Sequence, residues 1–256
     1  MTENIIVERD GHVGIITINR PDKLNAMTPA MANRLVEVVN GFNTDDAVRC
    51  VVLTGAGERA FCAGSDIRQL DDYDTPWNFR NRPDYCDAIR SLLKPSIAAV
   101  NGYAFGGGLE TAMACDIRIC SENATFAAPE IKLGWIGGGG MAAGLAHAVG
   151  PSNAALMIMT GDPIDAVTAE RWGLVSRVVS QAFLLTEAKA IAATIASRAP
   201  IAAETAKLNL RAAWDLTLRD AIAYEKDLQT ICFATEDARE GRTAFKEKRT
   251  PTFQRR

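Results

Sequence analysis

Residues 101–110, with the sequence NGYAFGGGLE, decide the fold of this chain. The apolar run over residues 95–105 is typical of a buried strand, and the apolar segment 111–115 predicts a helix. The three glycines therefore lie at a strand-to-helix turn. The first amides of a helix have no intrahelical partner and lie at the positive end of its dipole. An oxygen that gains negative charge during a reaction would be stabilised at such a turn.

Two glutamates accompany this turn. Glu110 falls one residue inside the first turn of the predicted helix, and Glu130 follows in a second motif, Pro129-Glu130. The pattern predicts an acyl-thioester enzyme whose oxyanion hole is made of main chain and whose acid/base groups are two glutamates. Taken alone, Glu110 could be a helix-start residue that the dipole favours, and Glu130 could be the salt-bridge partner of a loop.

The composition and charge exclude several kinds of partner. Hydrophobic residues make up 48% of the chain and charged residues 23%, which is ordinary for a globular protein. The formal net charge of −3 gives no global attraction to nucleic acid or to anionic membranes. No stretch approaches the roughly 20 apolar residues of a membrane span, and the N-terminus lacks the features of a signal peptide. We therefore expect a cytoplasmic protein with no nucleic-acid or membrane partner.

Other catalytic chemistries have few suitable residues. Six scattered cysteines form no CxxC pair, which indicates reduced core residues. The two histidines, His12 beside a hairpin turn and His147 among small residues, suit a nucleophilic triad poorly. Neither a P-loop nor the usual spacing of metal ligands occurs, so we expect no metal and no separate cofactor. The remaining possibilities are acid/base catalysis by carboxylates and stabilisation of charge by main-chain amides.

The first 180 residues alternate predicted strands and helices. Asp10-Gly11 joins a β-hairpin, and Thr28-Pro29 is typical of the start of a helix. A second glycine-rich turn, residues 136–140, opens another helix. The predicted strands are 4–8, 13–19, 49–54, 116–121, 125–128 and 174–179, and the predicted helices are 28–43, 65–70, 83–93, 141–149, 154–160 and 168–172, with an aperiodic loop over 71–82.

Residues 55–60, GAGERA, fit the glycine spacing of a dinucleotide-binding turn. That motif requires a helix to open at its second glycine. No helical period appears here before Gly64, so the pattern favours a surface turn after a strand.

The end of the chain is predicted to be purely helical. After Ser180 the composition shifts to Ala, Leu, Lys and Glu, with helices over residues 183–196, 201–214, 217–234 and 237–248. Their apolar faces are broader than a small helical tail can cover, which favours packing on another subunit over packing on the chain's own core. We expect a core over residues 1–195 and a helical oligomerisation region over 196–256.

Several sequence blocks follow one another in a recognisable order: Arg20-Pro21 with Asn25-Ala26, residues 61–67 (FCAGSDI), residues 101–110, Cys115-Asp116, residues 126–134 (FAAPEIKLG) and residues 244–249 (AFKEKR). Together they resemble the crotonase (enoyl-CoA hydratase/isomerase) superfamily nearly from end to end. The resemblance implies an α/β fold with a spiral core of repeated ββα units and a C-terminal α-helical trimerisation region. It also implies a homotrimer or a hexamer built as a dimer of trimers.

The resemblance further implies catalytic roles. The amides of Ser65 and Gly107 would form the oxyanion hole for the thioester carbonyl, and Glu110 and Glu130 would be the catalytic pair. The amide of Gly138 would help to hold the catalytic water.

A hooked acyl-CoA substrate is also implied. Its adenine would lie near Lys23, Leu24 and Ala26, while Arg68 and, from a neighbouring subunit, Lys248 would meet its phosphates. The other residues expected to line the CoA and acyl site are Ala63, Gly64, Asp66, Ile67, Pro129 and Leu133.

Because both glutamates are present, the resemblance implies an enoyl-CoA hydratase of fatty acid β-oxidation. Such an enzyme adds water reversibly to a 2-enoyl-CoA to give a 3-hydroxyacyl-CoA, and coenzyme A is part of the substrate. The alternatives are a 3-enoyl-CoA to 2-enoyl-CoA isomerase or another acyl-CoA enzyme of the superfamily, and a non-enzymatic RNA- or protein-binding member, which the net charge disfavours. Gly137, where proline is usual, and residues 141–145 (MAAGL) depart from the hydratase pattern and leave the acyl group open.

Overall fold

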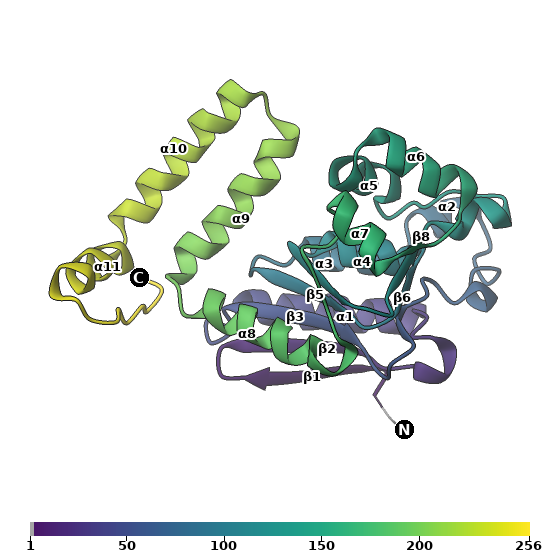
Figure 1. Cartoon of the computed structure of the whole chain (residues 1–256), viewed down its shortest axis with the longest axis horizontal. Helices are drawn as coiled ribbons and strands as arrows, with labels where there is room; N and C mark the ends of the chain where they lie inside the picture. The colour runs from purple at the N-terminus through teal and green to yellow at the C-terminus, as the bar shows by residue number, and fades with distance from the viewer. Residues whose placement is uncertain (1–2) are drawn as a thin grey trace.

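A six-stranded sheet underlies the computed structural model, which describes residues 3–256 (Figure 1). The strand order is β1-β2-β3-β5-β7-β10. β1 and β2 form the predicted antiparallel hairpin, and all the other neighbouring pairs are parallel. The strands are β1 Ile5–Asp10, β2 Val13–Ile18, β3 Cys50–Gly55, β5 Ser96–Val100, β7 Ile117–Ser121 and β10 Arg177–Val179.

A second, four-stranded sheet has the order β4-β6-β8-β9. The pairs β3 and β4, β5 and β6, and β7 and β8 each give one strand to each sheet, and a helix or helical turn follows each pair. This repetition confirms the predicted spiral of ββα units. The elements are β4 Ala60–Cys62, β6 Tyr103–Phe105, β8 Thr125–Ala127 and β9 Ile164–Asp165, with η2 Ile67–Gln69, α4 Gly107–Ala114 and η3 Pro129–Leu133 after the three pairs.

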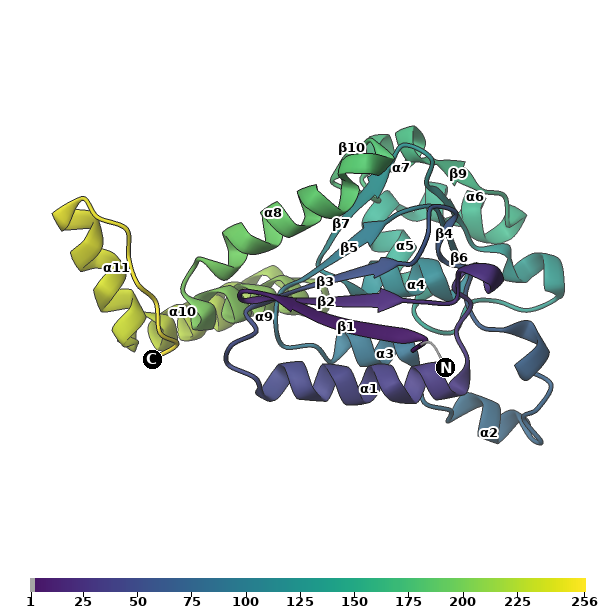
Figure 2. The same ribbon diagram turned by 90° about the horizontal axis from the view of Figure 1, so that it is seen from below.

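The six-stranded sheet is buried on both faces, as its nearly continuous apolar strands require. Val51 and Leu53 of β3 face the cluster that contains Leu35, whereas Val52 faces the cluster that contains Ala188. Figure 2 shows α1 and α3 on one side of the strands and α8 on the other. These helices are α1 Pro29–Thr44, α3 Tyr85–Arg90 and α8 Leu184–Ala196. The sheet and the helices on its two faces thus support the loops that carry the candidate site.

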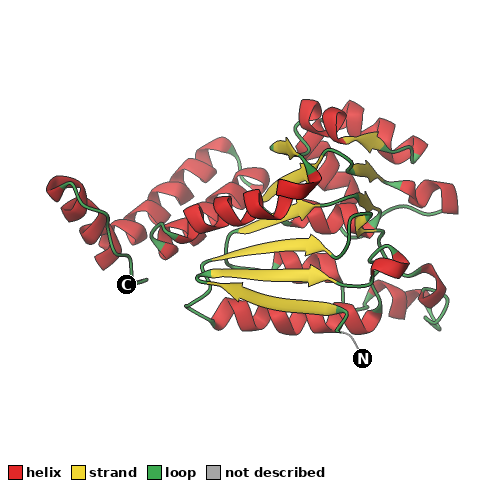
Figure 3. Cartoon of the chain, turned by 60° about the horizontal axis from the view of Figure 1, so that its bottom comes forward, coloured by secondary structure: helices red, strands yellow, loops and turns green. Residues whose placement is uncertain are grey.

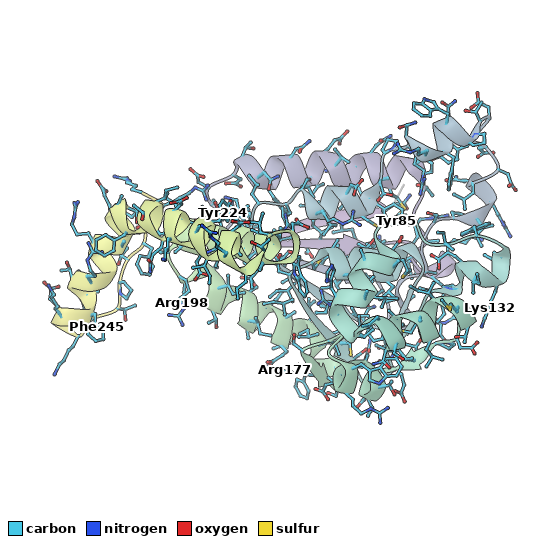
Figure 4. All side chains as sticks on the ribbon, turned by 90° about the horizontal axis from the view of Figure 1, so that it is seen from above. Tyr85, Lys132, Arg177, Arg198, Tyr224 and Phe245 are labelled. Carbon is cyan, nitrogen blue, oxygen red and sulfur yellow. The ribbon has the colours of Figure 1, made fainter. Side chains whose placement is uncertain are left out.

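Three C-terminal helices extend away from the two sheets (Figures 1 and 3). Buried ion pairs tie the first of them to the core, because Lys94 Nζ lies 3.1 Å from Glu204 Oε1 and Lys207 Nζ lies 2.8 Å from Asp116 Oδ2. Large apolar side chains on the extension are exposed in the single chain, and Phe245 lies at its far end (Figure 4). The helices are α9 Pro200–Asp215, α10 Leu218–Ala234 and α11 Glu236–Glu247. Both the domain boundary and the role of the extension in oligomerisation stay predictions.

The apolar run over residues 95–105 is not the single strand that we predicted. It is divided into β5 and β6, which belong to different sheets. The break falls at Asn101, whose Nδ2 donates to Gly55 O at 2.9 Å and to Gly57 O at 2.6 Å, while its Oδ1 accepts from Gly55 N at 3.1 Å. A Cβ at Gly102 would lie 2.3 Å from Arg59 O, so only glycine fits at this position.

The remaining elements agree with the predicted order, with three corrections. α4 starts at Gly107 rather than at residue 111, and Gly108 in its first turn packs its backbone against Cys62 O. The loop 71–82 contains a short helix, α2, which Thr75 caps by accepting from Asn78 N. β9 was not predicted. Residues 56–59 form a turn that leads into β4, as expected in place of a dinucleotide site. The other elements are η1 Pro21–Lys23, α2 Pro76–Arg80, α5 Met141–Val149, α6 Pro151–Thr160, α7 Ala166–Trp172 and η4 Gln181–Phe183.

No helix within residues 3–256 has the length and apolarity that crossing a membrane requires.

Candidate active site

Two backbone bends meet at the N-terminus of α4. A Cβ atom added at Gly64 would lie 3.1 Å from Gly107 N, so the bend that carries Ser65 and the glycine turn are in direct contact. Hydrogen bonds from Met27 N to Gly64 O and from Asp66 N to Met27 O, both 2.8 Å, fix the first bend. Within the described part of the chain, neither the Ser65 amide nor the Gly107 amide donates a hydrogen bond. Two unpaired donors therefore lie at adjoining turns.

Close packing explains the glycines of this turn. Gly106 has a φ of +54°, which favours glycine, and a Cβ at Gly107 would lie 1.9 Å from Tyr85 Oη. Tyr85 comes from α3 and is buried, and its hydroxyl is 2.9 Å from Ser65 Oγ; Figure 4 labels its position. One phenol thus contacts both bends. No pattern in the sequence indicated Tyr85 as part of the site.

Glu110 reaches from α4 to the start of α5. Its side chain is only 5% exposed, and its Oε1 accepts from Gly139 N at 2.8 Å and from Met141 N at 3.0 Å. Burial raises the pKa of the carboxyl to about 7, with a further rise from nearby Glu130 and a partial offset from the two amides. A carboxyl that titrates near neutrality can both take up and release a proton.

Glycines also enclose the Glu110 carboxylate. A Cβ at Gly139 would lie 2.7 Å from Glu110 Oε2, and a Cβ at Gly137 would lie 2.8 Å from Oε1 and 2.5 Å from Met141 Cβ. The two departures from the hydratase pattern are therefore coupled, since Met141 occupies the space that a side chain at residue 137 would need. By contrast, no described atom lies within 4 Å of a Cβ placed at Gly138, so the predicted water-holding residue faces open space.

Glu130 lies on the other side of the glycine turn. It belongs to η3, and a Cβ at Gly106 would lie 2.8 Å from its Oε1. Among the atoms of residues 3–256, its buried Oε2 has no hydrogen-bond partner. Burial raises the pKa of this carboxyl as well. The structure thus brings the two predicted acids to the turn that carries the free amides, and an orphaned carboxylate oxygen indicates a polar ligand there.

The predicted CoA-binding segment lies beside the first bend. Ala63 N donates to Leu24 O at 3.0 Å, which joins the Leu24–Ala26 region to the Ser65 bend. Asp66 Oδ2 accepts from Arg20 at 3.2 Å, and its other oxygen caps η2. Of the other residues predicted to line the site, Gly64 is buried and Pro129 is half-buried, whereas Lys23, Ile67, Arg68 and Leu133 are exposed.

Lys248 is not brought to this site within one chain. It follows α11 at the far end of the extension (Figure 1), with a φ of +55°. We predicted that it acts in the site of a neighbouring subunit, and the structure of a single chain does not test that prediction.

Comparison with known proteins places these features in a family. The sequence profile described as "Enoyl-CoA hydratase/isomerase" matches residues 8–256. The chain is 43% identical to "Probable enoyl-CoA hydratase, mitochondrial" of Dictyostelium discoideum, over 96% of this chain and 89% of that protein. It is 40% identical to the "Short-chain-enoyl-CoA hydratase" of Clostridium acetobutylicum, over 96% and 95% of the two chains.

Solved structures agree in fold as well. The crystal structure of an enoyl-CoA hydratase from Bacillus anthracis superposes with a TM-score of 0.95 at 35% identity, covering 99% of this chain and 100% of that chain. An enoyl-CoA hydratase subunit from Geobacillus kaustophilus gives a TM-score of 0.93 at 38% identity, covering 99% of both chains.

Proposed function

The chain belongs to the enoyl-CoA hydratase/isomerase family, and on that premise we propose that it catalyses the reversible addition of water to the 2,3 double bond of a 2-enoyl-CoA. The single observation that carries this proposal is the pair Glu110 and Glu130. Both carboxyls are desolvated, both have a raised pKa, and both lie against the turn that presents the free Gly107 amide. A reaction that moves one proton from water and one to carbon needs two such groups.

The mechanism begins at the thioester carbonyl. The amides of Ser65 and Gly107 donate to its oxygen, which draws electron density away from the β-carbon. Each backbone donor in a dry site can lower the barrier by about 3 kcal/mol. One glutamate then removes a proton from water as the oxygen adds to the β-carbon, and the other delivers a proton to the α-carbon. General acid/base assistance of this kind contributes about 10²- to 10⁴-fold.

Protonation near neutrality suits this exchange of roles. A carboxyl with a pKa of about 7, as at Glu110, is present in both forms at physiological pH. The reverse reaction, dehydration, uses the same two groups in the opposite protonation states. Because the two carboxyls interact, they should titrate as a coupled pair. The open space around Gly138, next to the glycine whose amide binds Glu110, supports a role for this residue in holding the water.

The binding mode and assembly complete the proposal. The adenine end of the CoA would bind at Lys23, Leu24 and Ala26, with Arg68 at the phosphates. Lys248 of a neighbouring subunit would join it, which requires the proposed trimer or dimer of trimers. The exposed apolar side chains of α9–α11 support such an assembly. The proposed activity suits a role in fatty acid β-oxidation, and we propose the cytoplasm as its location. The thioester path would be lined by Ala63, Gly64, Asp66, Ile67, Pro129 and Leu133.

The test is hydration of crotonyl-CoA, followed by the loss of enoyl-thioester absorbance. Glu110→Gln and Glu130→Gln should each lower turnover by about 10²-fold or more while CoA binding is retained. Glu122→Gln is the matched control, because Glu122 is exposed and lies after β7, away from the turn. Full activity in either site variant would refute the paired-acid mechanism.

Isotopic water separates the hydratase from the isomerase. A hydratase places the labelled oxygen on the β-carbon of the product, whereas an isomerase moves the double bond and leaves the label in the solvent. Isomerisation of a 3-enoyl-CoA without uptake of the label would favour the alternative activity.

A further inference from the structure

We propose that Arg90 is a positioning residue for Glu110, and that it acts by holding the glycine turn whose amides bind the Glu110 carboxylate. Its effect on catalysis rests on the function proposed above, whereas its effect on the Glu110 carboxyl does not. Arg90 itself touches no group that would react.

The geometry of three successive peptides carries this inference. The first donates Gly139 N–H to Glu110 Oε1 at 2.8 Å, and the third donates Met141 N–H to the same oxygen at 3.0 Å. The carbonyl of the peptide between them, Gly139 O, accepts a hydrogen bond from Arg90 Nη2. The guanidinium therefore restrains the peptide that links the two donors. A Cβ at Gly140 would lie 2.7 Å from Arg90 Nη2, which shows how closely the guanidinium follows the turn.

The turn needs such a restraint because of its composition. Residues 137–140 are four consecutive glycines, and glycine gives up more conformational freedom on folding than any other residue. Gly140 also has a φ of +101°. The glycines have no side chains that could fix the orientation of the amide N–H groups, so a contact from another element must do so. Arg90 supplies it from the last turn of α3.

Arg90 is in turn fixed on two further sides. Its other terminal nitrogen, Nη1, pairs with Asp87, one turn earlier on α3. Its backbone carbonyl accepts from Arg211 Nη1 of α9 at 2.6 Å. The guanidinium thus connects the glycine turn with α3, and α3 is attached to the first helix of the C-terminal extension.

The charges around Glu110 set the expected direction of the effect. Glu130 faces it from η3, and Asp84, which precedes α3, adds a further negative charge that raises its pKa. The thiol of Cys86 and the phenol of Tyr85 lie on the same side and are buried. Loss of Arg90 would remove a positive charge and loosen the two amides that favour the ionised carboxylate. Glu110 should then hold its proton to a higher pH.

Arg90→Met tests the proposal, with Arg34→Met as the matched control. Arg34 pairs with Glu37 at the same spacing on an exposed helix face, so its loss removes a comparable ion pair far from the turn. The first readout is isotope-edited infrared titration of the protonated Glu110 carboxyl, assigned by its absence in Glu110→Gln. The titration midpoint should move to higher pH in Arg90→Met and stay in place in Arg34→Met.

Kinetics give the second readout. For crotonyl-CoA hydration we expect kcat at pH 7 to fall by about tenfold to 10²-fold in Arg90→Met with KM changed much less, and the acid limb of the pH profile to move upward. Arg90→Lys, which keeps the charge and a donor, should restore part of the rate. If the methionine variant does not fold, Arg90→Gln, which removes the charge and keeps a donor, replaces it in both measurements.

An unchanged Glu110 titration would overturn the proposal, even if the rate fell, because a structural role alone lowers the rate at every pH. If the unmodified protein hydrated no enoyl thioester, the proposed function would fail. The infrared titration would still decide whether Arg90 controls Glu110.

Discussion

Replacement of Glu110 by Gln should change how the stability of the protein depends on pH. The carboxyl is desolvated in the folded protein, and its pKa is raised from 4.5 to about 7. In the unfolded chain it should titrate near its ordinary value. Below pH 4.5 the carboxyl is protonated in both the folded and the unfolded state, so its burial does not reduce the free energy of unfolding through ionisation. As pH rises from 4.5 to 7, the unfolded chain ionises first, and the folded state loses stability.

The size of the effect follows from the shift. At about 1.4 kcal/mol per pKa unit, a rise from 4.5 to about 7 corresponds to about 3 kcal/mol. Glutamine keeps an oxygen that can accept from Gly139 N and Met141 N but carries no charge to desolvate. Relative to the unmodified protein, Glu110→Gln should therefore gain about 3 kcal/mol between pH 4.5 and pH 7 and gain nothing further above pH 8.

Urea unfolding at a series of pH values measures this difference. Protein concentration must be the same in all samples, because the stability of an oligomer depends on it. Glu122→Gln is the control, because it removes one carboxyl at an exposed position. A constant offset between Glu110→Gln and the unmodified protein, or a relative loss of stability with rising pH, would refute the reasoning.

Two pairs of substitutions test the packing around the glycine turns. Gly107→Ala would place Cβ 1.9 Å from Tyr85 Oη, so it should lower the free energy of unfolding in urea by about 1–3 kcal/mol and remove most of the hydration rate. The double variant with Tyr85→Phe should regain part of the stability and part of the rate, since the nearest remaining ring atom is 2.9 Å away. Gly137→Ala should cost a similar amount because of the 2.5 Å approach to Met141 Cβ. Met141→Gly should relieve part of this cost, whereas Met141→Ala, which keeps Cβ, should not; the 2.8 Å approach to Glu110 Oε1 remains in both. Equal behaviour of the two Met141 variants would contradict this account.

Local chemistry was enough to predict many elements from the sequence. Thr28 and Pro29 marked the start of α1, and Thr28 Oγ1 does accept from Met31 N. The glycine turn before Met141 gave the bounds of α5 correctly. The β1–β2 hairpin followed from Asp10-Gly11 between two runs rich in strand-forming residues. In each case a cap, a turn or a period of a few residues determines the structure.

Contacts between distant segments could not be predicted in this way. The division of residues 95–105 between two sheets depends on Asn101 and on Gly55, which precedes it by 46 residues. Similarly, the need for glycine at residue 108 arises from Cys62, because a Cβ at residue 108 would lie 1.9 Å from Cys62 O. An apolar run gives the same periodicity whether it forms one buried strand or two.

The site shows the same limit. The motif around residues 101–110 and Pro129-Glu130 indicated both glutamates, and the structure brings them to one turn. The sequence did not reveal that the amides of Gly139 and Met141 hold Glu110, or that Arg90, 49 residues away from Gly139, holds that turn. The raised pKa of Glu110 is a property of this enclosure, so it could not follow from residue type.

The junction at Asn101 constrains how this protein can vary. Residues before it lie in register with β3 and β7, while residues after it lie in register with β4 and β8. An inserted or deleted residue between Ser96 and Phe105 would shift side chains in one sheet or the other to the wrong face. Natural or engineered variants can therefore carry different residues in this segment but not a different number of residues. Tags or reporters should be inserted elsewhere in the chain.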